Sequence, residues 1–410
     1  MKKKTLWTRN YSLLNLATVL GAAGGIAGNY ALSFLVYDET GSTLAAGLLV
    51  ALQVVPHFVL PLIIAPWMDR YPRKPFLVAG DMIGGICYTA AGFNLRNFEF
   101  SYLTYLIFSL MIACLGAMDS LSYNSIFPNV IPEGYEEKGY AVSGILYPIM
   151  NVLIMPVAAL LLDTIGVANI LILQGVFAIV ASVLESGIRL HEEIRLPKTD
   201  SGIRQWWHDF CDGFRYLKGE RGLLGMFTYR AVSNGAAIGY GPVLVAFFRS
   251  APGFSAFMYS FFSVAEFLGR TVGGFYQYRV TIPKEKQFHV TYFIYQIYDI
   301  MDAILLWIPY PFMLINRAVC GFLGMNSLTL REAAVQRYLP EAYRARVNAF
   351  QDAYISAAGS FMALIIGLLG EITDYRMTMT ISAVFCIIIC WITIGRNQVH
   401  VRKIYNPNIE

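Results

Sequence analysis

The sequence carries little charge for its length. Only 14% of its 410 residues are Asp, Glu, Lys or Arg, whereas 56% are hydrophobic, and the mean hydropathy is +0.52. Soluble domains usually carry about 25% charged residues, so this composition excludes a soluble enzyme. We therefore expect lipid to be the solvent for most of the chain.

Residues that could hold a metal ion or a phosphate are also scarce. The sequence has five histidines and six cysteines, and it has no Gly-Lys-Ser/Thr phosphate loop. His57 and His289 stand without ligand spacing, and five of the cysteines fall in apolar stretches, so neither a metal site nor a disulfide framework is expected. The basic residues form no patch of the kind that binds nucleic acid. We expect no catalytic residue, no metal and no bound cofactor.

What the sequence does contain is a series of apolar stretches, each about 20 residues long, the length that crosses a bilayer. The first follows three lysines, as in a signal peptide, but it is too long for one and is expected to be retained. We predict an all-α polytopic membrane protein with about twelve spans, at residues 11–36, 43–67, 75–95, 101–124, 140–163, 168–187, 222–247, 254–278, 288–308, 311–333, 347–370 and 377–395.

The basic residues predict the orientation of these spans. With the N-terminus inside, 25 of the 31 lysines and arginines lie in segments on the cytoplasmic side, Arg331 and Arg337 among them. The outer loops hold three, Arg96, Arg249 and Arg376. Because cytoplasmic loops carry an excess of Lys and Arg, we expect both termini in the cytoplasm and a multi-pass location in the cell membrane.

An internal repeat divides the chain into halves. A shift of 208 residues brings the Pro132-Glu133-x-Tyr135 turn onto Pro340-Glu341-x-Tyr343 without a gap. Each copy joins a fourth span to a fifth, which is typical of transporters built from parallel repeats. We expect two six-helix halves, 1–188 and 222–410, joined by a cytoplasmic linker at 189–221 that contains an amphipathic helix from about Ile203 to Leu217.

The loop between the second and third spans resembles the signature of the major facilitator superfamily. Asp69, Arg70, Arg73 and Lys74 match its acidic and basic positions, and Ala65 and Pro72 stand where the signature has glycine. In that family the loop latches the two halves in the outward-open state, so the resemblance implies a gating role for these four residues, with Asp81 and Asp119 nearby. The other interpretation is a basic inner loop that only sets orientation.

A more specific resemblance is to the macrolide-efflux-type drug exporters of that superfamily. It rests on the stretch from Phe34 to Ser42 that leaves the first span, on the stretch from Phe127 to Glu133 after the fourth, and on Asp209-Phe210 with Gly213-Phe214-Arg215-Tyr216-Leu217 in the linker helix. The resemblance implies the major facilitator fold and export of small amphipathic molecules.

Charged residues inside spans are costly, by roughly 2.5 to 3.5 kcal/mol each on insertion scales, and usually face a cavity or a partner. The predicted spans of the second half contain Arg230, Glu266, Arg270, Asp299, Asp302, Arg317 and Asp352. Glu266, Asp299 and Asp302 are expected near the middle of the membrane. They could bind a coupling proton, or they could form a static ion-pair network with Arg270 that holds spans eight and nine together.

Several polar residues in spans expected to line the central cavity are further candidates for binding substrate or protons. In the second half these are Arg230, Asn234 and Tyr240, with Arg230 a candidate substrate, proton-relay or gating residue. In the first half they are Asn29 and Tyr123.

These features predict a monomeric secondary active transporter that works by alternating access, with a proton gradient driving export of a small amphipathic molecule. Its partners would be that molecule and the lipid bilayer. One alternative is uptake or exchange of a small metabolite, which could be an anion attracted by Arg230. A membrane sensor without transport activity is an alternative from another class.

The latch hypothesis predicts an asymmetric effect of substitution. Asp69→Asn should slow transport strongly with expression kept, because a partly buried charge and its hydrogen bonds are worth about 1.5 to 3 kcal/mol, enough to shift a two-state population about tenfold to a hundredfold. Gln277→Ala, at the position related by the repeat, should change little. Transport rates and spin-label distances between the inner ends of spans four and ten measure this. Unchanged rates and distances in Asp69→Asn would leave the loop only an orientation signal.

Overall fold

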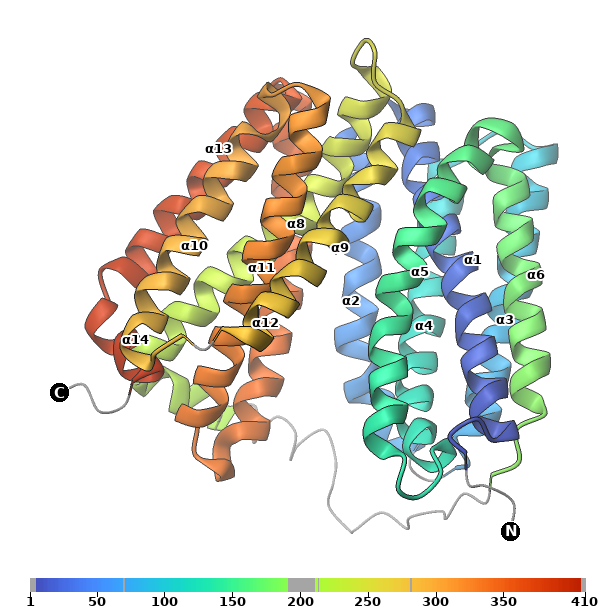
Figure 1. Ribbon diagram of the computed structural model, residues 1–410. Coiled ribbons are helices and arrows are strands. Elements are labelled where there is room, and N and C mark those ends of the chain that lie inside the picture. Colours follow the sequence, from blue (N-terminus) through green and yellow to red (C-terminus); the bar gives the residue numbers. More distant parts are fainter. Residues whose placement is uncertain (1–4, 69–70, 191–210, 213, 281, 407–410) are drawn as a thin grey trace. The chain divides into compact units, whose positions relative to one another are not determined.

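The computed structural model describes residues 5–68, 71–190, 211–212, 214–280 and 282–406, and over these ranges it contains helices and no strand (Figure 1). The predicted all-α class is confirmed. The chain divides into two compact units. Unit 1 comprises residues 1–41 and 52–203, and unit 2 comprises residues 42–51 and 204–410. The predicted halves keep residues 42–51 with the first half, whereas the contacts group them with the second.

Unit 1 contains six long helices, of which α2 begins in unit 2. They are α1 (Arg9–Thr40), α2 (Thr43–Met68), α3 (Lys74–Asn97), α4 (Tyr102–Val130), α5 (Glu136–Thr164) and α6 (Gly166–Ser186). Their order and lengths follow the predicted spans, with ends that extend one or two turns beyond several of them. The added turns carry polar residues, which hydropathy alone assigns to loops.

From residue 221 onward, the described part of unit 2 contains six further long helices and a short C-terminal one. They are α8 (Arg221–Ser250), α9 (Ala256–Arg279), α10 (Lys284–Ile304), α11 (Tyr310–Tyr338), α12 (Glu341–Ile372), α13 (Tyr375–Cys390) and α14 (Gln398–Tyr405). A 3₁₀ turn, Leu305–Trp307, continues α10, and a π-helical turn, Trp391–Gly395, continues α13.

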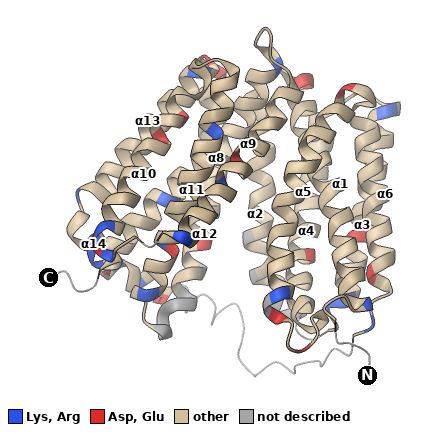
Figure 2. Cartoon of the chain, in the orientation of Figure 1, with Lys and Arg blue, Asp and Glu red and all other residues tan. Residues whose placement is uncertain are grey.

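Among the described residues, nine helices are long and apolar enough to cross a membrane. The long helices outside that set are α9, α10 and α11, which carry Glu266, Arg270, Asp299, Asp302, Arg317 and Arg331. Figure 2 shows Lys, Arg, Asp and Glu within the helices of this unit as well as at their ends. The structure therefore supports a polytopic membrane protein in which α9, α10 and α11 are less apolar than the other long helices because they carry charged side chains.

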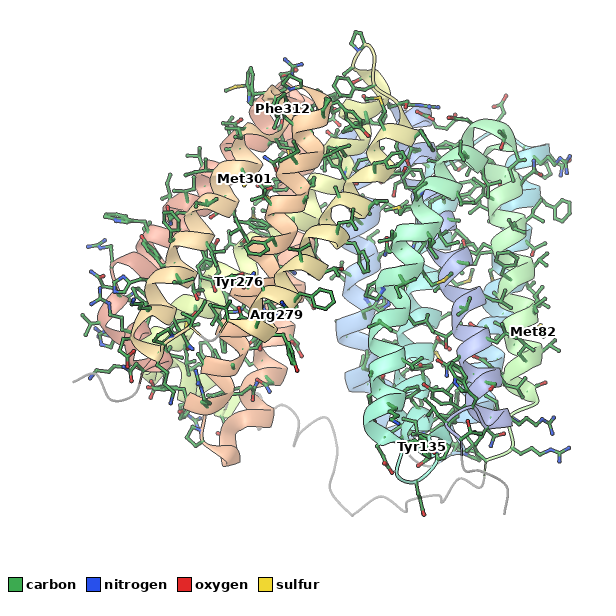
Figure 3. The ribbon with its side chains drawn as sticks, viewed as in Figure 1. Met82, Tyr135, Tyr276, Arg279, Met301 and Phe312 are labelled. Atoms are coloured by element: carbon green, nitrogen blue, oxygen red, sulfur yellow. The ribbon has the colours of Figure 1, made fainter. Side chains whose placement is uncertain are left out.

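The outer surfaces of the helices are apolar. Phe275 is 69% exposed, Phe312 is 58% exposed and Ile107 is 59% exposed, and the side chains drawn in Figure 3, with Phe312 and Tyr276 labelled, cover the helices on their outer faces. Apolar side chains exposed over whole helices are costly in water and favourable in lipid.

Helices α9 and α11 approach closely because each presents a glycine to the backbone of the other. A Cβ atom on Gly269 would overlap the carbonyl oxygen of Ala318, and a Cβ atom on Gly321 would overlap the carbonyl oxygen of Glu266. Small residues at a crossing allow this approach in membrane proteins. The crossing places Glu266 and Arg317, which flank it, in the same part of unit 2.

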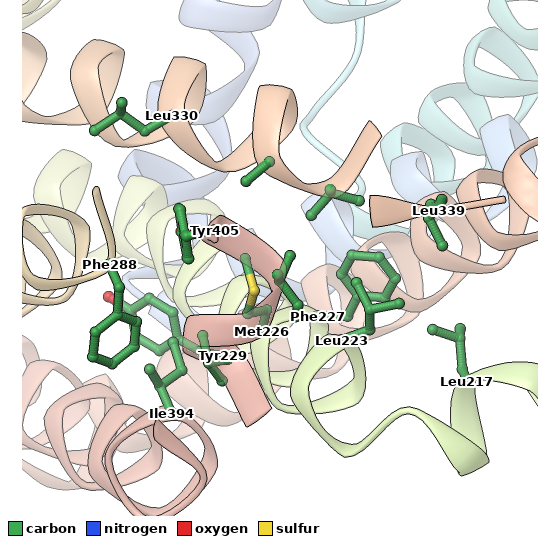
Figure 4. Packing of buried hydrophobic residues seen from close by; sticks show 14 of the residues in the cluster. Leu217, Leu223, Met226, Phe227, Tyr229, Phe288, Leu330, Leu339, Ile394 and Tyr405 are labelled. Atoms are coloured by element: carbon green, nitrogen blue, oxygen red, sulfur yellow. The ribbon is translucent and has the colours of Figure 1, made fainter. Parts of the chain in front are cut away.

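A cluster of buried hydrophobic residues closes one end of unit 2 (Figure 4). The sequence analysis ended the last helix at residue 395, but α14 follows and buries Val401, Ile404 and Tyr405, each at most 2% exposed, in this cluster. The Arg402 guanidinium lies over the ring of Phe288, 5.3 Å from its centroid. Helix α14 has only eight residues and is too polar for a membrane span. In the sequence, only its amphipathic pattern indicates that it is a helix and not an irregular C-terminal segment.

The predicted amphipathic helix from Ile203 to Leu217 lies mostly outside the described residues. Residues 211–212 and 214–219 are helical. Leu217 is fully buried in the cluster of Figure 4, and Phe214 packs on Phe350 with ring centroids 5.5 Å apart. The described end of the linker therefore packs on unit 2.

The first turns of α2 are attached to α12. Glu371 accepts hydrogen bonds from the Ser42 hydroxyl at 2.6 Å and from the backbone N–H of Leu44 at 3.0 Å. One turn earlier on α12, the carbonyl oxygen of Gly367 accepts from the Thr43 hydroxyl at 2.8 Å. A carboxylate at a helix N-terminus satisfies backbone N–H groups and interacts favourably with the helix dipole.

Neutralising this carboxylate should loosen the start of α2. We expect Glu371→Gln to remove about 0.3 to 1 kcal/mol of charge and dipole stabilisation and to speed hydrogen exchange in residues 42–51, measured by mass spectrometry on the purified protein. Asp374→Asn is the control, because Asp374 caps α13 by accepting from the Arg376 N–H at 3.1 Å. Exchange in 42–51 that is equal in both variants would contradict the attachment.

Candidate functional site

Unit 2 contains a cavity of about 400 Å³ between α8, α9, α10 and α11, here called the unit 2 cavity. Ligand pockets in proteins commonly have volumes of about 300 to 1,000 Å³. Charged side chains from all four helices line it, namely Arg230, Glu266, Arg270, Asp302, Arg317 and Arg331. Aromatic side chains line the rest of the wall, with Asn234 among the polar residues between them; the aromatic residues are Tyr229, Tyr240, Tyr259, Phe262, Tyr295 and Tyr298.

One end of the charged lining is a buried ion pair between α10 and α11. The Arg317 guanidinium donates from Nη2 to Oδ1 of Asp302, and both residues are at most 8% exposed. Asn316 supports the pair, because its Oδ1 accepts from Arg317 Nη2 at 2.8 Å while its Nδ2 donates to the carbonyl oxygen of Met301 at 2.8 Å. The arginine is therefore held by a carboxylate and an amide that is itself fixed to α10.

A second pair lies along one face of α9. Arg270 donates to Oε1 of Glu266 from Nε at 2.9 Å and from Nη2 at 2.7 Å. The Arg270 side chain is 49% exposed and the Glu266 side chain is 33% exposed. This pair is therefore far less desolvated than the pair of Arg317 and Asp302. Arg270 bonds an acid of its own helix and does not bridge to Asp299 or Asp302 by a hydrogen bond that the structure describes.

Arg230 and Arg331 share one carboxylate at the other end of the lining. Arg230 Nη1 lies 2.6 Å from Oε1 of Glu332, and Arg331 Nη2 lies 3.5 Å from the same oxygen. Arg331 Nη1 also lies 3.5 Å from the hydroxyl of Tyr295. Asp352 on α12 is exposed and attracts Arg230 electrostatically, but it is not part of the cavity lining.

Asp299 has a different environment from Asp302, although both stand in the last two turns of α10. It is 2% exposed and accepts a hydrogen bond from the Tyr229 hydroxyl at 3.1 Å. It lies behind Tyr229, which lines the cavity, and is not itself part of the lining. Both aspartates are nearer to the end of the helix than the predicted span implied, because α10 begins at Lys284 and its α-helical part ends at Ile304.

Unit 1 contains a smaller cavity of about 130 Å³, lined by Asp81, Asp119 and Gln174 among glycines of α1, α3 and α4. Asp119 Oδ1 is buried without a hydrogen-bond partner among the described residues. Glu185, 4% exposed on α6, interacts electrostatically with both aspartates. The sequence analysis placed Asp81 and Asp119 with the latch, and the structure adds Glu185 to them.

The predicted latch is described only in part. Asp69 and Arg70 lie outside the described residues. Arg73 Nη1 donates to the hydroxyl of Ser125 on α4 at 3.2 Å, and Lys74 Nζ donates to the carbonyl oxygen of Ser186 on α6 at 2.7 Å. These two basic residues therefore fix the start of α3 to its neighbours within unit 1.

Two candidates of the first half lie outside the cavities found in the described residues. Asn29 is exposed on α1. Tyr123 stacks on Phe127 at 5.3 Å between ring centroids, and its hydroxyl lies 3.4 Å from that of Ser143. Neither residue lines the unit 1 or the unit 2 cavity.

Sequence reasoning did not select four residues that the structure brings to these sites, namely Glu185, Arg317, Arg331 and Glu332. Arg317 was noted in a span without a partner, and Arg331 was counted with the cytoplasmic charges. The signal that could have found Arg331 is its spacing from Arg317, because residues 14 apart lie four turns apart on one face of a helix.

The two ion pairs should differ sharply in their effect on stability. Asp302→Asn leaves Arg317 buried without a counter-charge, and breaking such a pair costs about 3 to 5 kcal/mol. Glu266→Gln, in the half-exposed pair, should cost about 0.2 to 1 kcal/mol. Thermal unfolding in detergent measures both, and Asp302→Leu combined with Arg317→Met should recover much of the loss. Equal midpoints for the two single variants would refute this ranking.

The model of the Major Facilitator Superfamily matches residues 14–296. An uncharacterised MFS-type transporter of Bacillus subtilis, YkuC, is 23% identical over 243 residues, which are 56% of this chain and about half, 55%, of that relative.

Solved structures show the same fold. The nucleoside transporter NupG is similar with a TM-score of 0.71 at 12% identity, over 95% of this chain and 99% of that one. A POT family transporter in complex with 5-aminolevulinic acid has a TM-score of 0.72 at 12% identity, over 96% of each chain. A bacterial homologue of the human lysosomal transporter Spinster has a TM-score of 0.69 at 14% identity, over 99% of this chain and 100% of that one. With its family model matched over more than half its length, the chain belongs to the major facilitator superfamily.

Proposed function

We propose that this protein is a secondary active transporter that works by alternating access, and that the unit 2 cavity forms part of its solute-binding site. The family and the fold support a membrane transporter that is not an enzyme. The observation that carries the proposal is the cavity itself, about 400 Å³ in volume and lined by charged and aromatic side chains of four helices. Such groups are costly inside a membrane protein unless they face a cavity or a partner.

The lining favours a small polar solute. Four guanidinium groups and two carboxylates face the cavity, and an apolar molecule that filled it would remove water from them without replacing its hydrogen bonds. The second candidate is export of an amphipathic molecule, as in the macrolide-efflux-type branch. The six aromatic rings of the wall favour that candidate, because they could cover the apolar part of such a solute.

Proton coupling is part of the proposal, with Asp299 as the proton-binding residue. Asp302 is paired with Arg317 and Glu266 with Arg270, so each of these carboxylates already has an arginine as its partner. Asp299 is buried, and the hydrogen bond that the structure gives its carboxylate comes from the neutral phenol of Tyr229. It is also one side chain away from the cavity, where a change in the solute could reach it through Tyr229.

The remaining features of the proposal concern the whole protein. The excess of basic residues in the segments assigned to the cytoplasm supports cytoplasmic termini and a place in the cell membrane. We also propose a monomer that is driven by the proton gradient and needs no bound cofactor, with the bilayer and the solute as its partners.

Transport in proteoliposomes tests this function. Purified protein would be reconstituted and offered radiolabelled neutral, anionic, cationic and amphipathic compounds, with and without an imposed pH gradient. Solute leaving as protons enter supports export, and accumulation together with protons supports uptake. If no compound moves faster than in protein-free liposomes under either gradient, the proposed function is wrong.

Asp299→Asn should separate coupling from binding. We expect it to reduce gradient-driven transport at least tenfold and to leave solute exchange at equilibrium largely intact, because exchange needs no net proton movement. Asp352→Asn is the matched control, since Asp352 is exposed and lies outside the cavity lining. Full gradient dependence in Asp299→Asn would place the coupling residue elsewhere, with Glu266 and Asp302 tested next.

A further inference from the structure

We propose that Arg331 is the anion-binding residue of the unit 2 cavity, and that the transported solute carries a carboxylate or phosphate group that binds its guanidinium. This inference rests on the proposed function and names its substrate class. It differs from the expectation drawn from the sequence, which assigned an anion to Arg230 and counted Arg331 among the cytoplasmic charges.

Arg331 is a buried cation that faces an open space. It stands near the last turns of α11, is only 8% exposed, and lines the cavity together with Tyr295 and Ser327. The helix continues to Tyr338, so Arg331 is a full turn and more inside its end. A guanidinium at this depth is separated from bulk water and depends on the groups around it.

The hydrogen bonds of Arg331 are largely unmade. A guanidinium has five N–H donors, and the described contacts of Arg331 are two at 3.5 Å, to the Tyr295 hydroxyl and to Glu332. Strong hydrogen bonds between charged groups are about 2.7 to 2.9 Å long, so both contacts are weak. Its Nε is buried and has no hydrogen-bond partner among the described residues.

The other three arginines of the cavity are already neutralised. Arg270 bonds Glu266 at 2.7 Å and Arg230 bonds Glu332 at 2.6 Å. Arg317 bonds Asp302 and has Asn316 as a further acceptor. An anion at any of these three arginines would meet the repulsion of a carboxylate already bonded there, whereas at Arg331 it would supply acceptors that are missing.

Arg230 increases the attraction for an anion at this place. The Glu332 carboxylate is shared by two guanidinium groups and is 0.9 Å closer to Arg230 than to Arg331 by the two contact distances, 2.6 and 3.5 Å. The two arginines interact unfavourably with each other. A carboxylate or phosphate can accept two parallel hydrogen bonds from one guanidinium, and its charge would relieve the repulsion as well.

The aromatic wall beside Arg331 indicates the rest of the solute. Tyr295 and Tyr229 pack with ring centroids 4.6 Å apart, and both line the cavity next to the two arginines. Aromatic faces stack on planar groups. We therefore choose phenylacetate and phenyl phosphate as probes and phenylacetamide as the neutral counterpart of the same size.

Binding of these probes to the purified full-length protein tests the inference. We expect phenylacetate and phenyl phosphate to raise the thermal unfolding midpoint in a saturable manner and phenylacetamide to have no effect. Arg331→Gln should weaken binding of both anions at least tenfold, and Arg331→Lys, which keeps the charge without the planar fork, should weaken it less. Unfolding without probes shows whether each variant is folded.

Arg337→Gln is the matched control. Arg337 lies on the same helix and carries the same charge, but it is exposed and bonds Gln287 at 3.2 Å. It should bind both anions as the unsubstituted protein does. If the anions do not stabilise the protein, or stabilise Arg331→Gln and Arg337→Gln equally, Arg331 is a structural link between helices and the inference is wrong.

The inference and the proposed function can fail separately. Anion binding that depends on Arg331, in a protein that transports no compound of the panel, would keep the anion site and refute the transport function. Transport of panel compounds with an unchanged KM for anions in Arg331→Gln would keep the function and refute the anion site. A rise in KM of at least tenfold for anionic compounds alone would support both.

Discussion

A charge removed from water must find a partner, and in this protein that requirement shapes the whole of unit 2. The cost of desolvating an isolated ion is of order several kcal/mol even after relaxation, so each carboxylate that lines the unit 2 cavity stands beside an arginine. The helices that supply these residues, α9, α10 and α11, are the long helices of the described chain that are less apolar than the nine able to cross a membrane by length and composition. The glycine crossing brings α9 and α11 close together. The amide of Asn316 holds the Arg317 guanidinium beside α10, where Asp302 lies.

Unit 1 distributes its charges differently. Glu185, which is 4% exposed, and the half-buried Asp81 and Asp119 repel one another when charged, while Arg73 and Lys74 bond a hydroxyl and a carbonyl oxygen on neighbouring helices. The two repeats therefore share an order of helices but not a distribution of charge. The internal repeat of the backbone is therefore not matched by a repeat of the charged side chains. Of the two cavities described above, the larger belongs to unit 2.

The sequence predicts the helices well and the contacts between them poorly. Apolar stretches of about 20 residues recur along the chain, so the existence and order of the twelve long helices in the described residues follow from hydropathy. It cannot decide which charge near a helix end is buried, so Arg331 was assigned to the cytoplasm, although α11 continues past it to Tyr338. Nor can it tell that Asp302 meets Arg317 while Asp299 meets Tyr229, since those choices depend on how three helices cross. Residues such as Asn29 and Asp352 show the reverse error, because a polar residue in a span can also be exposed.

The division of α2 between the units has a mechanical consequence. Ser42 and the first nine residues of α2 group with unit 2. They are bonded to α12 at both ends, by Glu371 at the start and by Ser360, whose hydroxyl donates to the carbonyl oxygen of Ala51 at 3.2 Å. Immediately after this segment, Pro56 has no N–H to offer the carbonyl oxygen of Leu52. Helix α2 is therefore held to α12 up to Ala51, and directly after that residue it lacks one backbone hydrogen bond.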